Sequence, residues 1–173
     1  EKEIKIIPNL LVNCNRAIDI GANVGVWSYW LSKYAKQVES FEPNPKIFNA
    51  LKNIKIKNVN SYNVALSNKS GSVDLLIPKG SKGFSNQGAS LSSIKVQGEH
   101  KSISIEAKCL DEYNFLDVDF IKIDVEGHEH EVIEGAQETI NKFKPTMVIE
   151  MEEKHNQIPI EDQISSVEKL GYK

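Results

Sequence analysis

Asp19-Ile20-Gly21-Ala22-Asn23-Val24-Gly25 is the stretch of the sequence that decides the fold. Apolar residues precede it. The segment that follows carries large apolar side chains at the spacing of one helix face, namely Trp27, Trp30, Leu31 and Tyr34. The pattern predicts a buried strand, a tight turn that contains Gly21 and Gly25, and then a helix.

The predicted turn is suited to a ligand that carries both a positive and a negative group. Gly21 and Gly25 allow the backbone to approach a ligand closely. The start of the helix offers unpaired N–H groups and the positive end of the helix dipole to a carboxylate, and Asp19 offers a negative charge to an ammonium group. A dinucleotide is disfavoured because its G-x-G-x-x-G fingerprint is not present. A tight turn that binds no ligand is the alternative interpretation.

A second acidic residue favours a nucleoside as part of the ligand. Residues 37–42 form a short predicted strand that ends at Glu42, 21 residues after Gly21. A carboxylate that ends the second strand of a βαβ unit, about 20 residues after a glycine turn, binds ribose hydroxyls. The sequence therefore predicts one nucleoside-bearing ligand that lies across both strand ends.

The first half of the chain predicts a parallel α/β sheet. Asn44 and Pro45 have the residue types of a helix N-cap and a first helical position. Residues 59–66 form a third predicted strand, and residues 1–15 hold a small apolar cluster that is expected to pack on the sheet. The β-α-β-α-β order indicates parallel strands joined by right-handed crossovers.

Residues 68–110 interrupt this alternation and predict a β-rich insertion. Strands are expected at 72–77, 91–96 and 102–107, and a loop with three glycines is expected at 78–89. Elements inserted at the carboxyl ends of strands commonly form part of a substrate site. An edge hairpin is the alternative, and the sequence favours neither.

After the insertion the sequence returns to alternating elements, namely a strand at 118–125, a helix that extends to Ile140, a strand at 144–150 and a helix from Pro159 to Leu170. The first of these strands leads into a second group of titratable residues. If residues 122–128 stay extended, the two-residue period projects four side chains to one side, namely Lys122, Asp124, Glu126 and His128. For His128, a solvated position at the start of the next helix is the alternative.

Lys122 lies well inside this predicted strand. A buried ammonium group is costly unless it is paired, so a neighbouring carboxylate is expected, and the candidates are Asp19, Asp124 and Glu150. Convergence of charged groups at the carboxyl end of a strand is typical of a functional site.

Composition and charge indicate the class of protein. The chain has 173 residues and a formal net charge of −3, and this length is typical of one globular domain. The scattered lysines and the negative charge give no general attraction to nucleic acid or to an anionic membrane, and no apolar run reaches the ~20 residues of a membrane-spanning helix. Cys14 and Cys109 show no disulfide or metal-binding pattern. A single cytoplasmic domain over residues 1–173 is expected, with a small molecule or glycan as its partner.

The sequence contains five motifs whose order is informative, namely Asp19–Gly25, Phe41–Pro45, Asn63–Ser67 with Ser70–Val73, Gly88–Leu91, and Ile121–Glu129 with Glu134–Ala136. In this order they resemble the FkbM-type S-adenosylmethionine-dependent methyltransferases of the class I, Rossmann-like group. The resemblance covers about residues 16–173.

The resemblance implies a mostly parallel class I sheet with helices on both faces, and S-adenosylmethionine as the cofactor. The methionine end of the cofactor would be held by the residues of the turn, namely Asp19, Gly21, Ala22, Asn23 and Gly25. Glu42 would bind the ribose hydroxyls. Asn63 and Ala65 would lie along the adenine, and Asp124 would lie beside the amino group and the methyl donor.

The resemblance also implies methyl transfer to a hydroxyl group of a sugar, glycan or natural product, with S-adenosylhomocysteine as the second product. Such a reaction needs in-line placement of the hydroxyl and a base that removes its proton. His128 titrates nearest to neutral pH, and Asp124 and Glu126 are expected to orient it or replace it. Lys122 is expected to hold the carboxylates in place. No metal is assigned, because nothing in the spacing demands one.

Class I methyltransferases usually close their sheet with two further strands, which are not found after the helix that ends at Leu170. A minimal domain, a removed segment and a second subunit on the exposed sheet edge are the three explanations, and a dimer is expected in the last case.

Two other functions share part of this pattern. An NAD(P)-dependent oxidoreductase would keep the strand–turn–helix and Glu42, but it is disfavoured by the missing middle glycine and by the acidic cluster after Asp124. A non-catalytic cofactor-binding domain would keep the turn and would have no use for the residues around His128.

Overall fold

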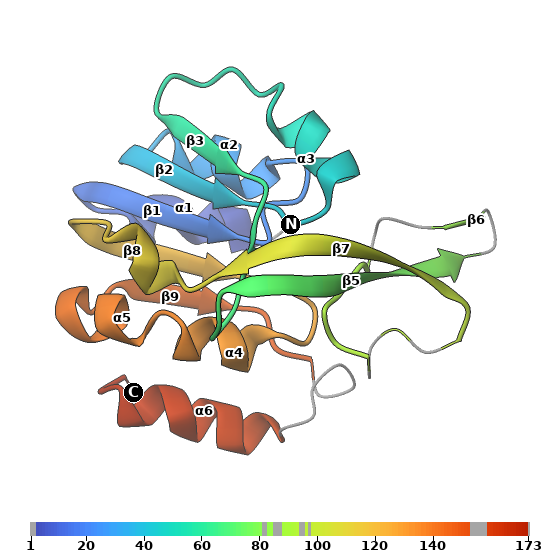
Figure 1. Cartoon of the computed structure of the whole chain (residues 1–173). Helices are drawn as coiled ribbons and strands as arrows, with labels where there is room; N and C mark the ends of the chain where they lie inside the picture. Colours follow the sequence, from blue (N-terminus) through green and yellow to red (C-terminus); the bar gives the residue numbers. More distant parts are fainter. Residues whose placement is uncertain are drawn as a thin grey trace.

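The main sheet of the computed structural model is fully parallel (Figure 1). The structure describes residues 3–80, 83–84, 88–93, 96, 98–152 and 159–172. Five strands lie in the order β3-β2-β1-β8-β9, with β1 at Cys14–Ile20, β2 at Ala35–Phe41, β3 at Val59–Tyr62, β8 at Val118–Ile123 and β9 at Thr146–Ile149. All four strand pairings are parallel. The predicted α/β fold with a mostly parallel, Rossmann-like sheet is confirmed.

Helices cover both faces of this sheet (Figure 1). Their bounds are η1 Glu3–Ile6, α1 Ile7–Leu10, α2 Val26–Leu31, α3 Pro45–Leu51, η2 Leu110–Tyr113, α4 Glu129–Glu134, α5 Gln137–Phe143 and α6 Ile160–Lys169. One buried apolar cluster joins α1 and α2 to the sheet, and a second joins α4 and α5 to its opposite face. The lead-in at residues 1–15 packs as expected where it is described, because Ile7 is fully buried in the first cluster.

The alternation of side chains along β1 decides what lies on each face. Ile18 and Ile20 enter the core beneath α4 and α5, whereas Ala17 enters the core beneath α1 and α2. Asp19 shares the face of Ala17, because successive side chains of a strand point to opposite faces. A buried carboxylate therefore lies under α2, close to the carboxyl end of β1.

The insertion forms a second, smaller sheet in the order β4-β7-β5-β6. It consists of β4 at Ala65–Leu66, β5 at Gly71–Gly80, β6 at Gly83–Phe84 and β7 at His100–Lys108. Figure 1 shows β5 and β7 as a long antiparallel pair that extends away from the main sheet. The predicted strands at 72–77 and 102–107 are confirmed and are longer than expected.

The strand predicted at 91–96 is wrong for the residues that the structure describes there. Residues 91–93 and 96 are not in a strand, and residues 94–95 lie outside the described part of the chain. Ser90 forms a single bridge with Leu76, and the Ser92 amide then donates to the Ser90 hydroxyl at 2.9 Å. Such a local side-chain bond competes with strand pairing and turns the chain.

The strand predicted at 59–66 is two strands in two sheets. Tyr62 pairs with Phe41 of β2, whereas Ala65 pairs with Ala107 of β7. Between them, the Asn63 side chain donates to the carbonyls of Glu42 (2.8 Å) and Pro43 (3.0 Å). These bonds fasten the chain to the end of β2 and redirect it into the insertion.

The single helix predicted to extend to Ile140 is also two helices, α4 and α5. They are separated at Gly135, where an added Cβ would lie 2.0 Å from the Ser67 carbonyl oxygen. The Gly135 carbonyl accepts a hydrogen bond from the Asp111 amide at 3.1 Å. The break therefore lets the chain after β4 pack directly against the helical layer.

Candidate active site

The turn after β1 brings the carboxyl ends of β1 and β8 into contact. Gly21 has φ 74°, and an added Cβ there would lie 1.8 Å from the Asp124 carbonyl oxygen. Gly25 has φ 86° and begins α2, and its added Cβ would lie 2.4 Å from Ile54 Cδ1. The absence of a side chain at Gly21 therefore allows the ends of β1 and β8 to approach each other. At Gly25 it allows the segment after α3 to pack against the turn.

Glu42 is oriented by this turn and by the start of α3. Its two carboxylate oxygens accept hydrogen bonds from the amides of Asn23 (2.9 Å) and Asn44 (2.8 Å). Burial raises the pKa of Glu42, while the two amides and the charge of Lys122 act in the opposite direction. A carboxylate offers about four lone-pair sites, so the side chain is held in place and can still accept bonds from hydroxyl groups.

A cleft of about 590 Å³, part of it open to solvent, lies at the carboxyl edge of the sheet. Its walls include five of the predicted site residues, namely Gly21, Asn23, Glu42, Asp124 and Glu126. Leu75 of β5 and residues 88–91 form another wall, so the insertion takes part in the cleft.

Two further hollows adjoin the cleft. A small one of about 270 Å³ is lined by Ala65, Val125 and His128 together with apolar residues, and it shares Gly21 with the cleft. A larger one of about 980 Å³, which includes open solvent, lies between Trp27 and Glu150. Asp124 lines both this hollow and the cleft.

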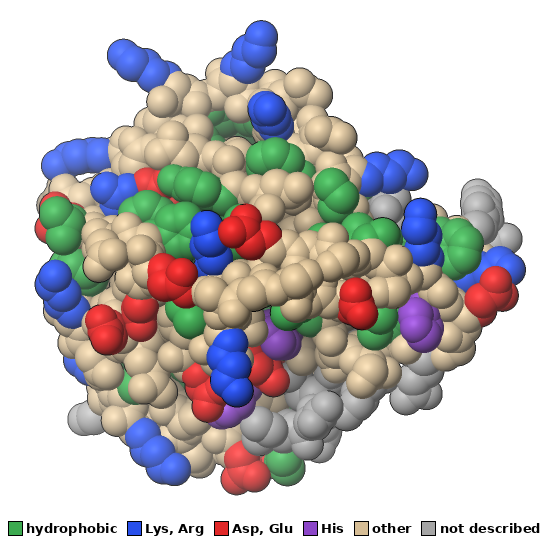
Figure 2. All heavy atoms as spheres, viewed as in Figure 1, with side chains coloured by type: hydrophobic (Ala, Val, Ile, Leu, Met, Phe, Trp, Pro, Cys, Tyr) green, Lys and Arg blue, Asp and Glu red, His purple; other side chains and the backbone are tan. Residues whose placement is uncertain are grey.

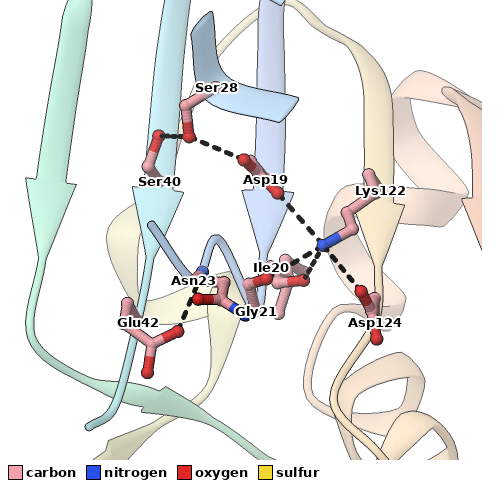
Figure 3. A network of polar contacts seen from close by, with 9 residues as sticks. All are labelled: Asp19, Ile20, Gly21, Asn23, Ser28, Ser40, Glu42, Lys122 and Asp124. Carbon is pink, nitrogen blue, oxygen red and sulfur yellow. Dashed lines mark hydrogen bonds and ion pairs between the residues drawn. The ribbon is translucent and has the colours of Figure 1, made fainter. Parts of the chain in front are cut away.

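Figure 3 shows the network behind the turn. Asp19 is fully buried and accepts a hydrogen bond from the Ser28 hydroxyl at 2.6 Å. Lys122 Nζ lies 3.4 Å from Asp19 Oδ1 and 3.3 Å from Asp124 Oδ2. The expected carboxylate partners of Lys122 are therefore confirmed for Asp19 and Asp124. Asp19 itself does not line the cleft.

The two carboxylates keep Lys122 in its charged form. Burial acts to lower its pKa, but the charges of Asp19 and Asp124 outweigh burial, and the pKa is raised. Asp124 also differs from Asp19 in access to solvent, because its side chain is 34% exposed and that of Asp19 is 0% exposed. Of the three charged side chains of this network, Asp124 is the one that lines the cleft.

The expectation that residues 122–128 stay extended is wrong, and His128 does not line the cleft with Asp124 and Glu126. β8 ends at Ile123, and Glu126 and Gly127 have φ values of 60° and 97°. The chain turns there instead of staying extended, so Lys122 and Asp124 meet, Glu126 lines the cleft, and His128 is carried to the small hollow.

His128 is held by side chains that the sequence pattern did not connect with it. Its Nε2 lies 2.9 Å from the Ser67 hydroxyl, and its Nδ1 lies 3.4 Å from Glu131 Oε2. Burial lowers the pKa of His128, against the opposing charges of Glu131 and Glu129. Ser67 ends the motif Asn63–Ser67, but no signal in the sequence indicates that it contacts His128, which lies 61 positions later.

Acidification is expected to destabilise the protein through His128. The folded protein holds the His128 pKa below its ordinary value of 6.5, which the unfolded chain retains. The unfolded state therefore binds the proton first, and the free energy of unfolding falls as the pH drops below about 6.5. His128→Gln keeps a hydrogen-bonding side chain and should flatten the pH dependence of the urea midpoint between about pH 7 and pH 5. An unchanged slope in that variant would assign the effect to other groups.

The other predicted cofactor residues lie around these hollows without lining the cleft. Ala22 is buried, and its amide donates to the Phe41 carbonyl at 2.8 Å. Asn63 is occupied by the backbone bonds described above, and Ala65 lines the small hollow. These residues shape the backbone around the cleft.

Comparison with known proteins identifies the family. The sequence profile described as "Methyltransferase FkbM domain" matches residues 19–173. No curated protein matches the sequence. The structure is similar to that of methyltransferase FkbM from Methylobacillus flagellatus KT, with a TM-score of 0.65, 16% sequence identity and coverage of 91% of this chain and 37% of that chain.

A second similar structure is an rRNA methylase from Streptococcus thermophilus, with a TM-score of 0.53 and 10% identity over 99% of this chain and 78% of that one. At these identities the two structures show a common fold, the Rossmann-like fold of methyltransferases. The present chain spans little more than a third of the length of the first of them. The profile match extends over most of the chain. The chain belongs to the FkbM methyltransferase family.

Proposed function

We propose that this domain binds S-adenosylmethionine in the cleft and transfers its methyl group to a hydroxyl group of a small molecule, sugar or glycan, with release of S-adenosylhomocysteine. The observation that carries the proposal is that Glu42 and Asp124, which follow the two strands on either side of β1, line one cleft together with Gly21 of the turn after β1. Such an arrangement suits a ligand with a ribose at one end and a cationic amino-acid group at the other.

The residues of the cleft fit the parts of this cofactor. Glu42 would accept bonds from the ribose hydroxyls, and the Gly21 turn with Asp124 would face the methionine end. The adenine ring would lie along the segment after β3, where Ala65 and Val125 line the small apolar hollow. Asp19 would act from behind the turn through Lys122, because its side chain is fully buried.

The cofactor supplies an activated methyl group on a sulfonium sulfur. The chain has to place the acceptor hydroxyl in line with that group and to remove the hydroxyl proton. Asp124 lines both the cleft and the larger hollow, so it can reach a hydroxyl group between them. Glu126 would assist from the wall of the cleft. His128 would serve as the base only after one ring nitrogen exchanges its partner, Ser67 or Glu131, for the acceptor.

The acceptor is expected to bind beside the insertion, which contributes Leu75 and residues 88–91 to the cleft. Within the glycine-containing loop predicted at 78–89, residues 81–82 and 85–87 lie outside the described part of the chain. On the face seen in Figure 2, Lys and Arg side chains are scattered over the surface instead of forming one patch, which supports an acceptor other than a polyanion. Among the described residues, no helix has the length and apolar character that a membrane crossing requires.

Calorimetric titration tests this proposal against the oxidoreductase alternative. We expect S-adenosylmethionine and S-adenosylhomocysteine to bind with dissociation constants in the micromolar range that is common for enzyme ligands, and NAD to give no heat. Glu42→Gln should weaken both ligands, because the new amide NH₂ would face a backbone N–H. Glu106→Gln, on the exposed part of β7, is the matched control and should change neither. Binding of NAD alone would refute the methyltransferase assignment of the cleft.

A further inference from the structure

Lys122 is a buried cation that joins the two strand ends of the site. It is 4% exposed, and its Nζ lies 2.9 Å from the Gly21 carbonyl oxygen and 3.4 Å from that of Ile20. The same atom contacts Asp19 and Asp124, as Figure 3 shows. The ammonium group is therefore surrounded by four oxygen atoms from the end of β1 and the segment after β8.

Few groups other than Lys122 stabilise the negative charge of the buried Asp19 carboxylate. Its Oδ2 accepts a hydrogen bond from the Ser28 hydroxyl, but its Oδ1 is buried and accepts no hydrogen bond from the residues that the structure describes. A buried carboxylate oxygen needs a nearby cation, and Lys122 is the one Lys or Arg side chain among the described residues that line the cleft and the larger hollow. Other carboxylates that line these spaces include Glu42 in the cleft, and Glu3 and Glu150 in the larger hollow.

Two carboxylates and one ammonium group leave this trio with one negative charge. The sulfonium cofactor and its thioether product differ by one positive charge at the sulfur atom, while their amino-acid ends are alike. The net negative charge of Asp19, Lys122 and Asp124 therefore attracts the positively charged sulfur of the cofactor, whereas the sulfur of the product carries no charge to attract. A unit charge that acts over about 10 Å at an effective dielectric constant of about 20–40 changes an affinity by about four- to fifteenfold.

We propose that Asp19 and Lys122 are positioning residues which set the net charge beside Asp124, and that this charge determines how strongly the site prefers the sulfonium cofactor over the neutral product. The inference rests on the proposed function, because it assigns S-adenosylmethionine to the cleft. Asp19 is a specificity residue in this scheme although no ligand touches it.

Substitutions that change the charge count in opposite directions test the idea. Asp19→Asn removes one negative charge and leaves Lys122 and Asp124 as a neutral pair. The ratio of the dissociation constants of S-adenosylhomocysteine and S-adenosylmethionine should then fall about four- to fifteenfold. The double variant Asp19→Asn/Lys122→Met leaves Asp124 alone with one negative charge, so the ratio should return toward the wild-type value even if both ligands bind more weakly.

A structural role alone would not give this rescue, because a second disruptive substitution would weaken both ligands further without restoring their ratio. Calorimetry at low salt, with thermal unfolding to verify folding, provides both constants. If Asp19→Asn does not fold, Asp124→Asn removes the same charge at a side chain that is one-third exposed, and its ratio should fall likewise. An unchanged ratio in the folded variants would overturn the inference, whereas a wild-type protein that binds neither ligand would instead overturn the proposed function.

Discussion

Gly21→Val is expected to abolish binding of S-adenosylmethionine and to lower the free energy of unfolding by about 3–5 kcal/mol, the sum of left-handed backbone strain and overpacking. Gly21 has φ 74°, where a β-branched residue is strongly disfavoured. The added Cβ would also lie 1.8 Å from the Asp124 carbonyl oxygen. The substitution therefore separates the segments that follow β1 and β8, both of which contribute residues to the wall of the cleft.

Gly98→Val is the matched control for this variant. Gly98 also has a positive φ, 85°, but apart from its chain neighbours no atom of the described residues lies within 4 Å of its added Cβ. In this variant the free energy of unfolding should fall only by the cost of backbone strain, about 1–2 kcal/mol. The variant should bind the cofactor as the wild type does. Chemical denaturation and calorimetric titration measure both effects. Wild-type affinity in Gly21→Val would show that the junction of β1 and β8 does not shape the binding site.

The first half of the site could be predicted because its signals are local in the sequence. A glycine turn after an apolar strand indicates where the backbone bends, and a carboxylate about 20 residues later indicates where the second strand ends. Gly21 and Glu42 accordingly line one cleft. The pairing of Lys122 could also be predicted, since a buried ammonium group requires a carboxylate wherever the fold places it.

The second half could not be predicted from the two-residue period. Glu126 has φ 60°, a conformation that residues other than glycine adopt rarely, so nothing in its identity indicated the turn. Gly127, with φ 97°, was the available signal for a bend. Without that bend the prediction placed His128 beside Asp124, whereas the structure places it against Ser67.

Long-range packing explains the other differences. The helix predicted to extend to Ile140 breaks because Gly135 packs against Ser67, a contact that depends on the position of β4. The third strand divides because Asn63 is bound to the end of β2. Both contacts join segments that the sequence pattern treats separately, and both place the insertion beside the cleft.

Asp124→Asn is expected to lower the rate of methyl transfer about 10²- to 10⁴-fold, which is the usual contribution of a general base. Asp124 is the candidate base that lines both the cleft and the larger hollow, and its side chain is 34% exposed. The amide would keep the shape of the side chain but would not accept the hydroxyl proton. Release of S-adenosylhomocysteine, measured with a hydroxyl acceptor found by screening sugars, glycans and phenols, gives the rate.

His128→Gln decides whether the base has been assigned correctly. Both ring nitrogens of His128 have partners, Ser67 at 2.9 Å and Glu131 at 3.4 Å, and burial lowers its pKa, so at neutral pH the ring is uncharged. If Asp124 removes the proton, His128→Gln should reduce the rate less than tenfold and leave cofactor affinity unchanged. A loss in His128→Gln as large as that in Asp124→Asn, with cofactor affinity intact, would instead identify the imidazole as the base. That result would also require Ser67 or Glu131 to move away from its ring nitrogen during turnover, because the base needs a free lone pair for the acceptor proton.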